Sequence, residues 1–231
     1  MRKILPFAAI LVLVVAGAVA YWGVSKRPSG DGAPEAGQTA AADGSMSQAQ
    51  AALPVLAVQP DDMVLGSPDA KVTIVEYASL TCPHCAHFET ETLPQLQKAY
   101  IDTGKVKLVY RDFPLDGLAL KAAMVAHCAG SEKYFAFLNL LFENQDSWAH
   151  IEDPVAGLAT IAKIGGMGEE QLRKCLNDEA LSQRVAKSRF DAEKSLDITS
   201  TPTFFINGEK VPGALPFEQF EAILKPLVSA P

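Results

Sequence analysis

The chain has few of the residues that indicate a metal protein or a nucleic-acid-binding protein. It holds four cysteines and five methionines in 231 residues, and its 27 acidic residues outnumber its 20 basic ones, for a formal net charge of -7. A surface with this charge is a poor match for phosphate backbones, so nucleic acid is not expected as a partner. The scarcity of soft ligands gives no support to copper binding. We expect neither a metal nor another cofactor.

Two of the four cysteines form the motif Cys82, Pro83, His84 and Cys85. The motif follows a β-branched, strand-like run at 72–77 and begins a helix-like run. In the first turn of a helix, unpaired N–H groups and the positive end of the helix dipole stabilise an anion, so Cys82 should ionise readily. Pro83 suits the first helical position, and His84 offers an N–H donor or a positive charge beside Cys82.

The spacing of this motif points to disulfide exchange. A thiolate is the attacking and leaving species in exchange, with Cys82 as the entry nucleophile and Cys85, one turn further along, as the resolving thiol. A zinc site usually needs a second ligand pair at matching spacing, and no such pair follows. A structural disulfide is the other alternative. We therefore expect redox chemistry at these residues.

The N-terminal region carries an apolar run over residues 4–24 that is flanked by basic residues on both sides. Residues 18–20, Ala-Val-Ala, resemble a signal-peptidase site. A run of about 20 apolar residues is also long enough to span a bilayer. Residues 1–24 are therefore expected to be a cleaved signal peptide or a membrane anchor. Both alternatives place the rest of the protein in an oxidising space, the periplasm or cell envelope, where disulfides persist.

Residues 25–62 have the composition of a flexible linker, because they are rich in Ala, Gly, Ser, Gln and Pro and contain no aromatic residue. The apolar stretch 53–58 is an exception that has the character of a docking segment. The remaining residues, 63–231, are enough for one domain with its own hydrophobic core.

The first part of this domain has a β-α-β pattern. Strand candidates at 72–77 and 105–110 are joined by a helix that runs from the redox motif to about residue 102. Pro94 should kink this helix near Leu93, while the apolar spacing continues through it.

A helical region follows at about 117–196, and a β-β-α pattern ends the chain. The expected helices of the region span 118–129, 132–143, 154–164, 169–177 and 180–195. The segment 203–211 predicts a hairpin, because Asn-Gly at its centre favours a type I′ turn. A last helix is expected from about residue 216 to 228.

This order of elements resembles the thioredoxin fold, an α/β fold, with an all-helical insertion between the β-α-β and β-β-α halves. Together with Cys-Pro-His-Cys, the insertion resembles the DsbA family of exported thiol:disulfide oxidoreductases, over about residues 63 to 227. The resemblance implies that Pro202 follows a cis bond and lies against the active-site sulfurs. It also implies that Thr201 offers backbone hydrogen bonds to an extended substrate peptide. Without the resemblance, strand termination is enough to explain a proline at this place.

The resemblance also implies a buried acid beneath the active site, at Glu76. Alternation along the strand puts Glu76 on one face with Val72 and Ile74, and both faces are largely apolar, which favours burial. A buried carboxyl group has a raised pKa and can exchange a proton with the Cys85 thiol. An ordinary solvent-facing position is the alternative.

The other two cysteines, Cys128 and Cys175, lie on apolar faces of expected helices in the insertion. A second, structural disulfide is the leading interpretation, and two buried free thiols are the alternative. The pairing depends on a distance that sequence does not supply.

These features predict an oxidase that donates its Cys82–Cys85 disulfide to unfolded or reduced envelope proteins and is reoxidised by a membrane partner. One alternative is a disulfide isomerase or reductase that uses the same residues as a dithiol. Residues 25–62 are too polar to supply the dimerisation module expected of an isomerase. Thr201 tempers the oxidase interpretation, because strongly oxidising DsbA relatives often have valine there. A non-enzymatic chaperone or copper carrier is the third hypothesis.

Overall fold

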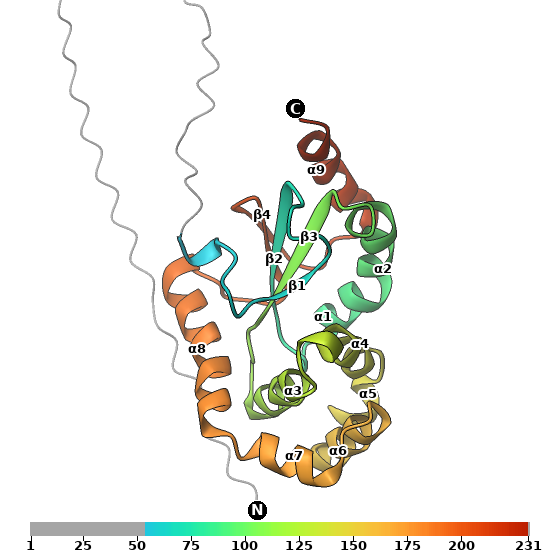
Figure 1. Ribbon diagram of the computed structural model, residues 1–231, viewed down its shortest axis with the longest axis vertical. Helices are drawn as coiled ribbons and strands as arrows, with labels where there is room; N and C mark the ends of the chain where they lie inside the picture. The colour runs from blue at the N-terminus through green and yellow to red at the C-terminus, as the bar shows by residue number, and fades with distance from the viewer. Residues whose placement is uncertain (1–53, 231) are drawn as a thin grey trace, which may run out of the picture. The chain divides into compact units, whose positions relative to one another are not determined.

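The computed structural model describes residues 54–230, which form a five-stranded mixed sheet with helices on both faces (Figure 1). The strands are β1 (Met63–Leu65), β2 (Val72–Ala78), β3 (Val106–Asp112), β4 (Thr203–Ile206) and β5 (Glu209–Pro212). Their order is β1-β3-β2-β4-β5, and of these pairs only β2 and β3 run parallel. This arrangement confirms the predicted α/β fold class. The expected signal peptide or anchor at 1–24 lies outside the described residues, and no helix within 54–230 is long and apolar enough to cross a membrane.

The central strand β2 separates two hydrophobic layers. Its Val72 and Ile74 side chains pack with those of the helix that follows the redox motif and of the C-terminal helix. Val75 and Tyr77 pack on the opposite face. β-branched residues suit a strand that is buried on both faces. Because side chains alternate along a strand, Glu76 shares the face of Val72 and Ile74 and points toward the redox helix.

The redox helix is continuous but irregular. Its four segments are α1 (Pro83–His87), the π turn η2 (Phe88–Thr92), α2 (Leu93–Leu96) and the π turn η3 (Gln97–Ile101). Pro94 has no N–H to donate to the preceding turn, and a π turn directly before it accommodates the missing bond. The irregularity therefore lies where the sequence predicted a kink, and the helix continues beyond it.

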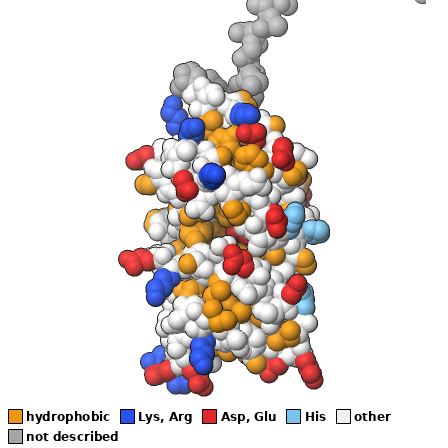
Figure 2. Space-filling view, turned by 90° about the vertical axis from the view of Figure 1, so that its right-hand side faces the viewer, with side chains coloured by type: hydrophobic (Ala, Val, Ile, Leu, Met, Phe, Trp, Pro, Cys, Tyr) orange, Lys and Arg blue, Asp and Glu red, His pale blue; other side chains and the backbone are white. Residues whose placement is uncertain are grey.

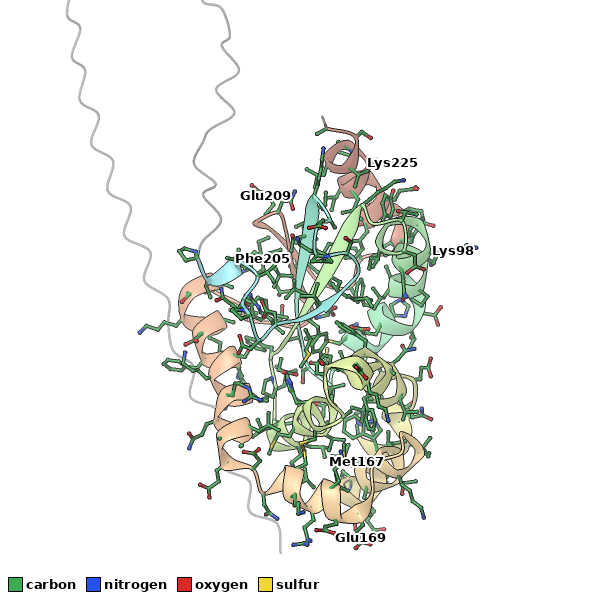
Figure 3. The ribbon with its side chains drawn as sticks, in the orientation of Figure 1. Lys98, Met167, Glu169, Phe205, Glu209 and Lys225 are labelled. Atoms are coloured by element: carbon green, nitrogen blue, oxygen red, sulfur yellow. A yellow bond between two sulfur atoms is a disulfide. The ribbon has the colours of Figure 1, made fainter. Side chains whose placement is uncertain are left out.

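The helical insertion fills residues 117–196 as predicted. It consists of α3 (Gly117–Cys128), α4 (Tyr134–Glu143), α5 (Gln145–Trp148), α6 (Pro154–Ile164), α7 (Glu169–Leu176) and α8 (Glu179–Leu196), with a 3-10 turn at Ser131–Lys133. Helices α5, α6 and α7 gather at the end of the domain away from the C-terminal helix, and α8 returns along the sheet (Figure 1). Helix α8 packs on the face of the sheet that carries Phe205 (Figure 3). Helix α5 and strand β1 are too short to show a periodic pattern, and neither was predicted from the sequence.

The C-terminal part matches its predicted hairpin and helix. Asn207 and Gly208 join β4 to β5 with φ angles of 48° and 94°, the positive values that a type I′ turn requires. The last helix, α9 (Phe217–Ser229), places Phe220 in contact with Phe88 of the redox helix and with Phe204 of β4. The hairpin and α9 thus complete the core on the redox-helix side of the sheet.

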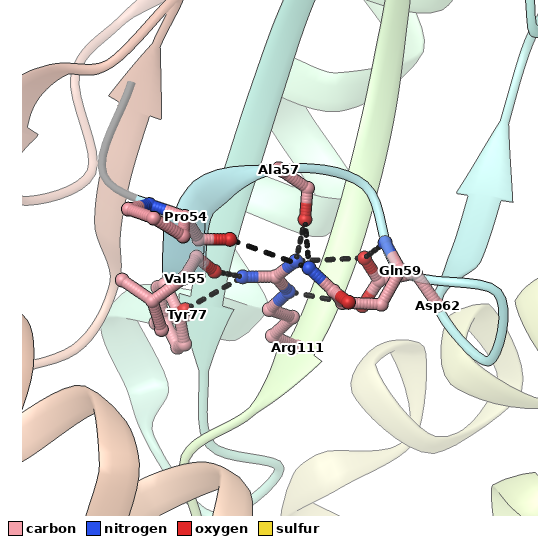
Figure 4. Close-up of polar contacts among 7 residues, drawn as sticks. All are labelled: Pro54, Val55, Ala57, Gln59, Asp62, Tyr77 and Arg111. Carbon is pink, nitrogen blue, oxygen red and sulfur yellow. Dashed lines mark hydrogen bonds and ion pairs between the residues drawn. The ribbon is translucent and has the colours of Figure 1, made fainter. Parts of the chain in front are cut away.

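Residues 54–62, which the sequence analysis assigned to the linker, lie on the domain. The short 3-10 helix η1 (Pro54–Leu56) buries Leu56, and the Arg111 guanidinium of β3 binds this segment (Figure 4). The hydrogen-bond partners of Arg111 are the carbonyl oxygens of Val55 and Ala57, the Asp62 carboxylate at 2.7 Å and the Tyr77 hydroxyl at 2.9 Å. Arginine presents five donors, and a buried guanidinium is stable when they are paired. Residues 54–62 therefore pack on the domain, as the docking character of 53–58 suggested.

Candidate active site

Cys82 lies at the N-terminal end of the redox helix, just after β2. It is the N-cap of α1, with an extended backbone at φ -87° and ψ 119°. Its carbonyl oxygen accepts the first helical hydrogen bond from the Ala86 N–H at 3.1 Å. Pro83 occupies the first helical position, where a missing N–H costs no helical bond. The Cys82 sulfur is therefore placed beside the unpaired N–H groups of the first turn.

Both motif cysteines are free thiols in this structure, and Cys82 is the acidic one. Its pKa is lowered to about 5, first by a hydrogen bond from Cys85, against the opposing effect of burial. Thr201 and the backbone N–H groups of Cys85 and His84 lower the pKa further. The imidazole of His84 is exposed, and the effect of His84 on the pKa of Cys82 comes from its backbone N–H.

Cys85 has the opposite character. Its side chain is completely buried, and its pKa is raised well above the usual value by burial first, then by the Cys82 sulfur and by Glu76. At neutral pH the motif therefore holds one thiolate and one thiol. This is the arrangement that a nucleophile and its resolving partner require.

Glu76 is completely buried, and a second acid, Glu89 of η2, is buried beside it. Neither oxygen of Glu76 nor Oε1 of Glu89 has a hydrogen-bond partner at normal distance among the described residues. Burial first, and then Glu89, raises the pKa of Glu76 well above its usual value. Burial raises the pKa of Glu89 to about 7. The pair therefore holds a proton at neutral pH close to Cys85.

Glu89 was not among the predicted site residues, although the sequence contains a signal for it. It lies four residues after Cys85, and Cys85, Phe88 and Glu89 share the buried stripe of the helix. An acid on an apolar stripe is the pattern that would have revealed it. Glu89 also borders a surface pocket of about 300 Å³ between the redox helix and α4. Figure 2 views this side, where hydrophobic side chains lie exposed among carboxylates.

The Thr201–Pro202 segment meets the redox motif although it is far away in sequence. The peptide bond between the two residues is cis, and Pro202 is buried. The Cys82 sulfur lies 3.4 Å from the carbonyl oxygen of Thr201. Three parts of the predicted site therefore lie together in the structure. They are Glu76, the Cys82–Cys85 motif and the Thr201–Pro202 segment.

Cys128 and Cys175 form a disulfide that joins the end of α3 to α7, with their Cα atoms 6.0 Å apart. This bond lies within the helical insertion and leaves the Cys82 and Cys85 thiols free. Across residues 54–230 no group of three or more His, Cys, Asp or Glu side chains is arranged to hold a metal ion.

Comparison with known proteins gives a consistent assignment. A family model described as thioredoxin matches residues 58–226. A putative protein-disulfide oxidoreductase of Rickettsia typhi is 36% identical over 152 residues, which are 65% of this chain and 56% of that relative. Disulfide bond formation protein D of Bacillus subtilis is 26% identical over 167 residues, 70% of this chain and 75% of the relative.

Among solved structures, α-DsbA1 of Wolbachia pipientis superposes with a TM-score of 0.71 at 34% identity. The match covers 75% of this chain and 94% of that one. The chain spans little more than half the length of the Rickettsia relatives. The family model and the α-DsbA1 structure together show that the chain belongs to the thioredoxin family and, within it, to the DsbA-like proteins.

Proposed function

We propose that this protein is a thiol:disulfide oxidase that donates its Cys82–Cys85 disulfide to reduced proteins. The observation that carries the proposal is the difference between the two thiols. The pKa of Cys82 is lowered to about 5, whereas that of the buried Cys85 is raised. A stabilised thiolate favours the reduced pair, so the oxidised pair readily gives up its disulfide.

The proposed reaction has two exchange steps. A substrate thiolate attacks the Cys82 sulfur, the Cys82–Cys85 bond breaks, and Cys85 leaves with the electron pair and takes a proton from the Glu76–Glu89 pair. A second substrate thiolate then attacks the substrate sulfur of the mixed disulfide, and Cys82 leaves as the thiolate. The substrate dithiol loses two electrons and two protons to become a disulfide. The two protein cysteines gain the two electrons, one proton restores the Glu76–Glu89 pair, and the other passes to solvent.

We place this reaction in the periplasm or cell envelope. The support is the apolar run at 4–24 with its basic flanks, which has the character of a signal peptide or anchor. The names of the Rickettsia and Bacillus relatives, which refer to protein disulfides and disulfide formation, agree with substrates that are reduced or unfolded proteins. Turnover requires reoxidation of the Cys82–Cys85 dithiol, and we assign this step to a membrane redox partner.

The redox equilibrium of the purified protein in glutathione buffers tests the direction of the reaction. We expect the Cys82–Cys85 pair to be reduced across most of the buffer range, as a disulfide donor would be. About 30 mV corresponds to 1.4 kcal/mol for a two-electron couple, so a coarse titration is sufficient. A Cys128→Ala/Cys175→Ala variant is the control that leaves a single titrating couple. A pair that stays oxidised in strongly reducing buffer would reject the oxidase in favour of a reductase or isomerase.

Pro202→Ala should slow exchange with a peptide at least tenfold more than exchange with a small disulfide. An extended peptide needs the backbone of Thr201 for strand-like pairing, whereas a small disulfide needs the Cys82 sulfur alone. The measurement compares both rates in the variant and in wild type. Pro154→Ala, at the start of α6, is a matched control that should change neither rate. Equal slowing of both substrates would show that Pro202 only shapes the fold.

A further inference from the structure

One buried amide of the helical insertion holds the backbone of the turn that carries Cys82. Gln145 is the first residue of α5 and is 5% exposed. Its Nε2 donates hydrogen bonds to the carbonyl oxygen of Leu80 at 2.7 Å and to that of Cys82 at 3.2 Å. Both bonds are buried and connect residues more than sixty positions apart in the sequence.

Side chains of this turn make contacts of their own, and the Cys82 N–H donates to the Ser79 carbonyl oxygen at 3.0 Å. The Thr81 hydroxyl donates to Asp116 at 2.7 Å, and Ser79 Oγ accepts from the Leu115 N–H at 3.2 Å. The carbonyl oxygens of Leu80 and Cys82, next to the reactive sulfur, bind Gln145 instead. Among the described residues, Gln145 is the hydrogen-bond partner of the Leu80 oxygen, whereas the Cys82 oxygen also accepts from Ala86. Gln145 therefore provides a restraint that the start of α3 does not provide.

The position of this amide matters for a thiolate. Carbonyl oxygens carry partial negative charge, and two of them directed at the Cys82 sulfur would oppose its ionisation. The amide hydrogens hold the Leu80 oxygen toward the insertion and offset the charge of both oxygens, while the Ala86 N–H also holds the Cys82 oxygen. The N–H groups of the first helical turn are then left to face the sulfur.

Helix α5 is a rigid support for the amide. The Trp148 side chain is completely buried, and its Nε1 donates to the Leu141 carbonyl oxygen of α4 at 2.8 Å. The Ala149 N–H bonds to the carbonyl oxygen of Gln145 itself at 2.8 Å. Functional groups on such elements hold their geometry better than groups on loops do.

We propose that Gln145 is a positioning residue of the redox centre, through which the helical insertion sets the reactivity of Cys82. Gln145 does not touch the reacting sulfurs. It acts by fixing the carbonyl groups of Leu80 and Cys82. The inference rests on the proposed function and deepens it, because it assigns to the insertion a part in disulfide donation.

Replacement of the amide by an apolar side chain of similar length tests the proposal. In reduced Gln145→Met, we expect the pKa of Cys82, followed by thiolate absorbance, to rise by about one unit. The glutathione equilibrium should shift up to tenfold toward the oxidised protein. Gln171→Met is the matched control, because Gln171 also crosses between helices of the insertion, donating to the Cys128 carbonyl oxygen at 3.0 Å. Gln171→Met should leave the pKa of Cys82 and the glutathione equilibrium at their wild-type values.

A purely structural amide would lower the melting temperature of Gln145→Met and leave the pKa of Cys82 and the glutathione equilibrium unchanged. That result would overturn the proposal. Gln145→Glu is the second variant, and it replaces both donor hydrogens by an acceptor. It should raise the pKa of Cys82 more than Gln145→Met does.

A measurement on the wild-type protein removes the dependence on variant folding. The side-chain amide resonances of Gln145 in the NMR spectrum should differ between oxidised and reduced protein. In the reduced protein they should titrate with the Cys82 ionisation, near its pKa of about 5. Resonances that respond to neither change would also overturn the proposal.

The two proposals fail in different ways. If wild-type protein is a poor disulfide donor in glutathione while the Gln145 amide follows Cys82 ionisation, the oxidase function is wrong and the role of Gln145 stands. If wild type is a good donor and Gln145→Met has the same equilibrium, the role of Gln145 is wrong and the oxidase function stands.

Discussion

Cys82→Ser reduces disulfide exchange to the uncatalysed background, a loss on the order of 1,000-fold or more, whereas Cys85→Ser accumulates mixed disulfides on Cys82. The reason is the position of each sulfur. Cys82 caps the helix, its pKa is lowered to about 5, and it lies beside Thr201. Cys85 is completely buried and is available only to resolve a bond already formed at Cys82.

Mass spectrometry of the Cys85→Ser protein, incubated with oxidised substrate, would identify the residue that carries the adduct. A Cys128→Ala/Cys175→Ala variant is the control and should retain exchange, because that disulfide lies within the insertion. Adducts on Cys128 or Cys175, with none on Cys82, would show that the entry nucleophile is assigned wrongly.

The difference in stability between the reduced and oxidised protein should change sign with pH. In the folded, reduced protein the pKa of Cys82 is lowered to about 5. In an unfolded chain it is about 8.5. Because the folded value is the lower one, ionisation of Cys82 stabilises the fold fully above the unfolded pKa, and the stabilisation is lost as pH falls through about 5. It exists only while Cys82 is reduced.

The sizes of the two contributions set the pH at which the stability difference between the reduced and oxidised protein changes sign. One pKa unit corresponds to about 1.4 kcal/mol, so ionisation contributes roughly 2 kcal/mol at pH 7 and about 3 kcal/mol at pH 8 after an allowance for solvent screening. Closing a loop as short as Cys82–Cys85 contributes about 2 kcal/mol to the oxidised protein by the chain-entropy relation. The reduced protein should therefore melt below the oxidised one at pH 4 and above it at pH 8.

Paired thermal melts at pH 4 and pH 8 measure this difference, with the Cys128–Cys175 bond kept intact in both samples. For a domain of this size each kcal/mol moves the melting temperature by about 2–4 °C. The difference in melting temperature between the reduced and oxidised protein should therefore change by roughly 10 °C between the two pH values. Cys82→Ser is the control that removes the thiolate. A gap that stays constant, with the oxidised form always more stable, would contradict both the lowered pKa and the disulfide-donor function.

The sequence by itself determined the order of the longer elements and the identity of the redox pair. The β-branched run at 72–77, the helical periodicity of 117–196 and the Asn207–Gly208 turn are local patterns, and each acts through neighbours a few residues away. The position of Cys82 at the start of a helix is equally local. Alternation along β2 also placed Glu76 on one face with Val72 and Ile74, and in the structure this face packs on the redox helix.

Only the tertiary structure decided what lies opposite these residues. Periodicity assigns a side chain to a face, but it does not identify the groups across from that face. Glu89 meets Glu76 because the redox helix packs on β2, and Arg111 binds residues 54–62 because β3 lies beneath them. Helix α5 is one turn long and has no period to detect, yet its Gln145 reaches the Cys82 turn from 63 residues away. Such contacts depend on how distant segments pack, which no local pattern encodes.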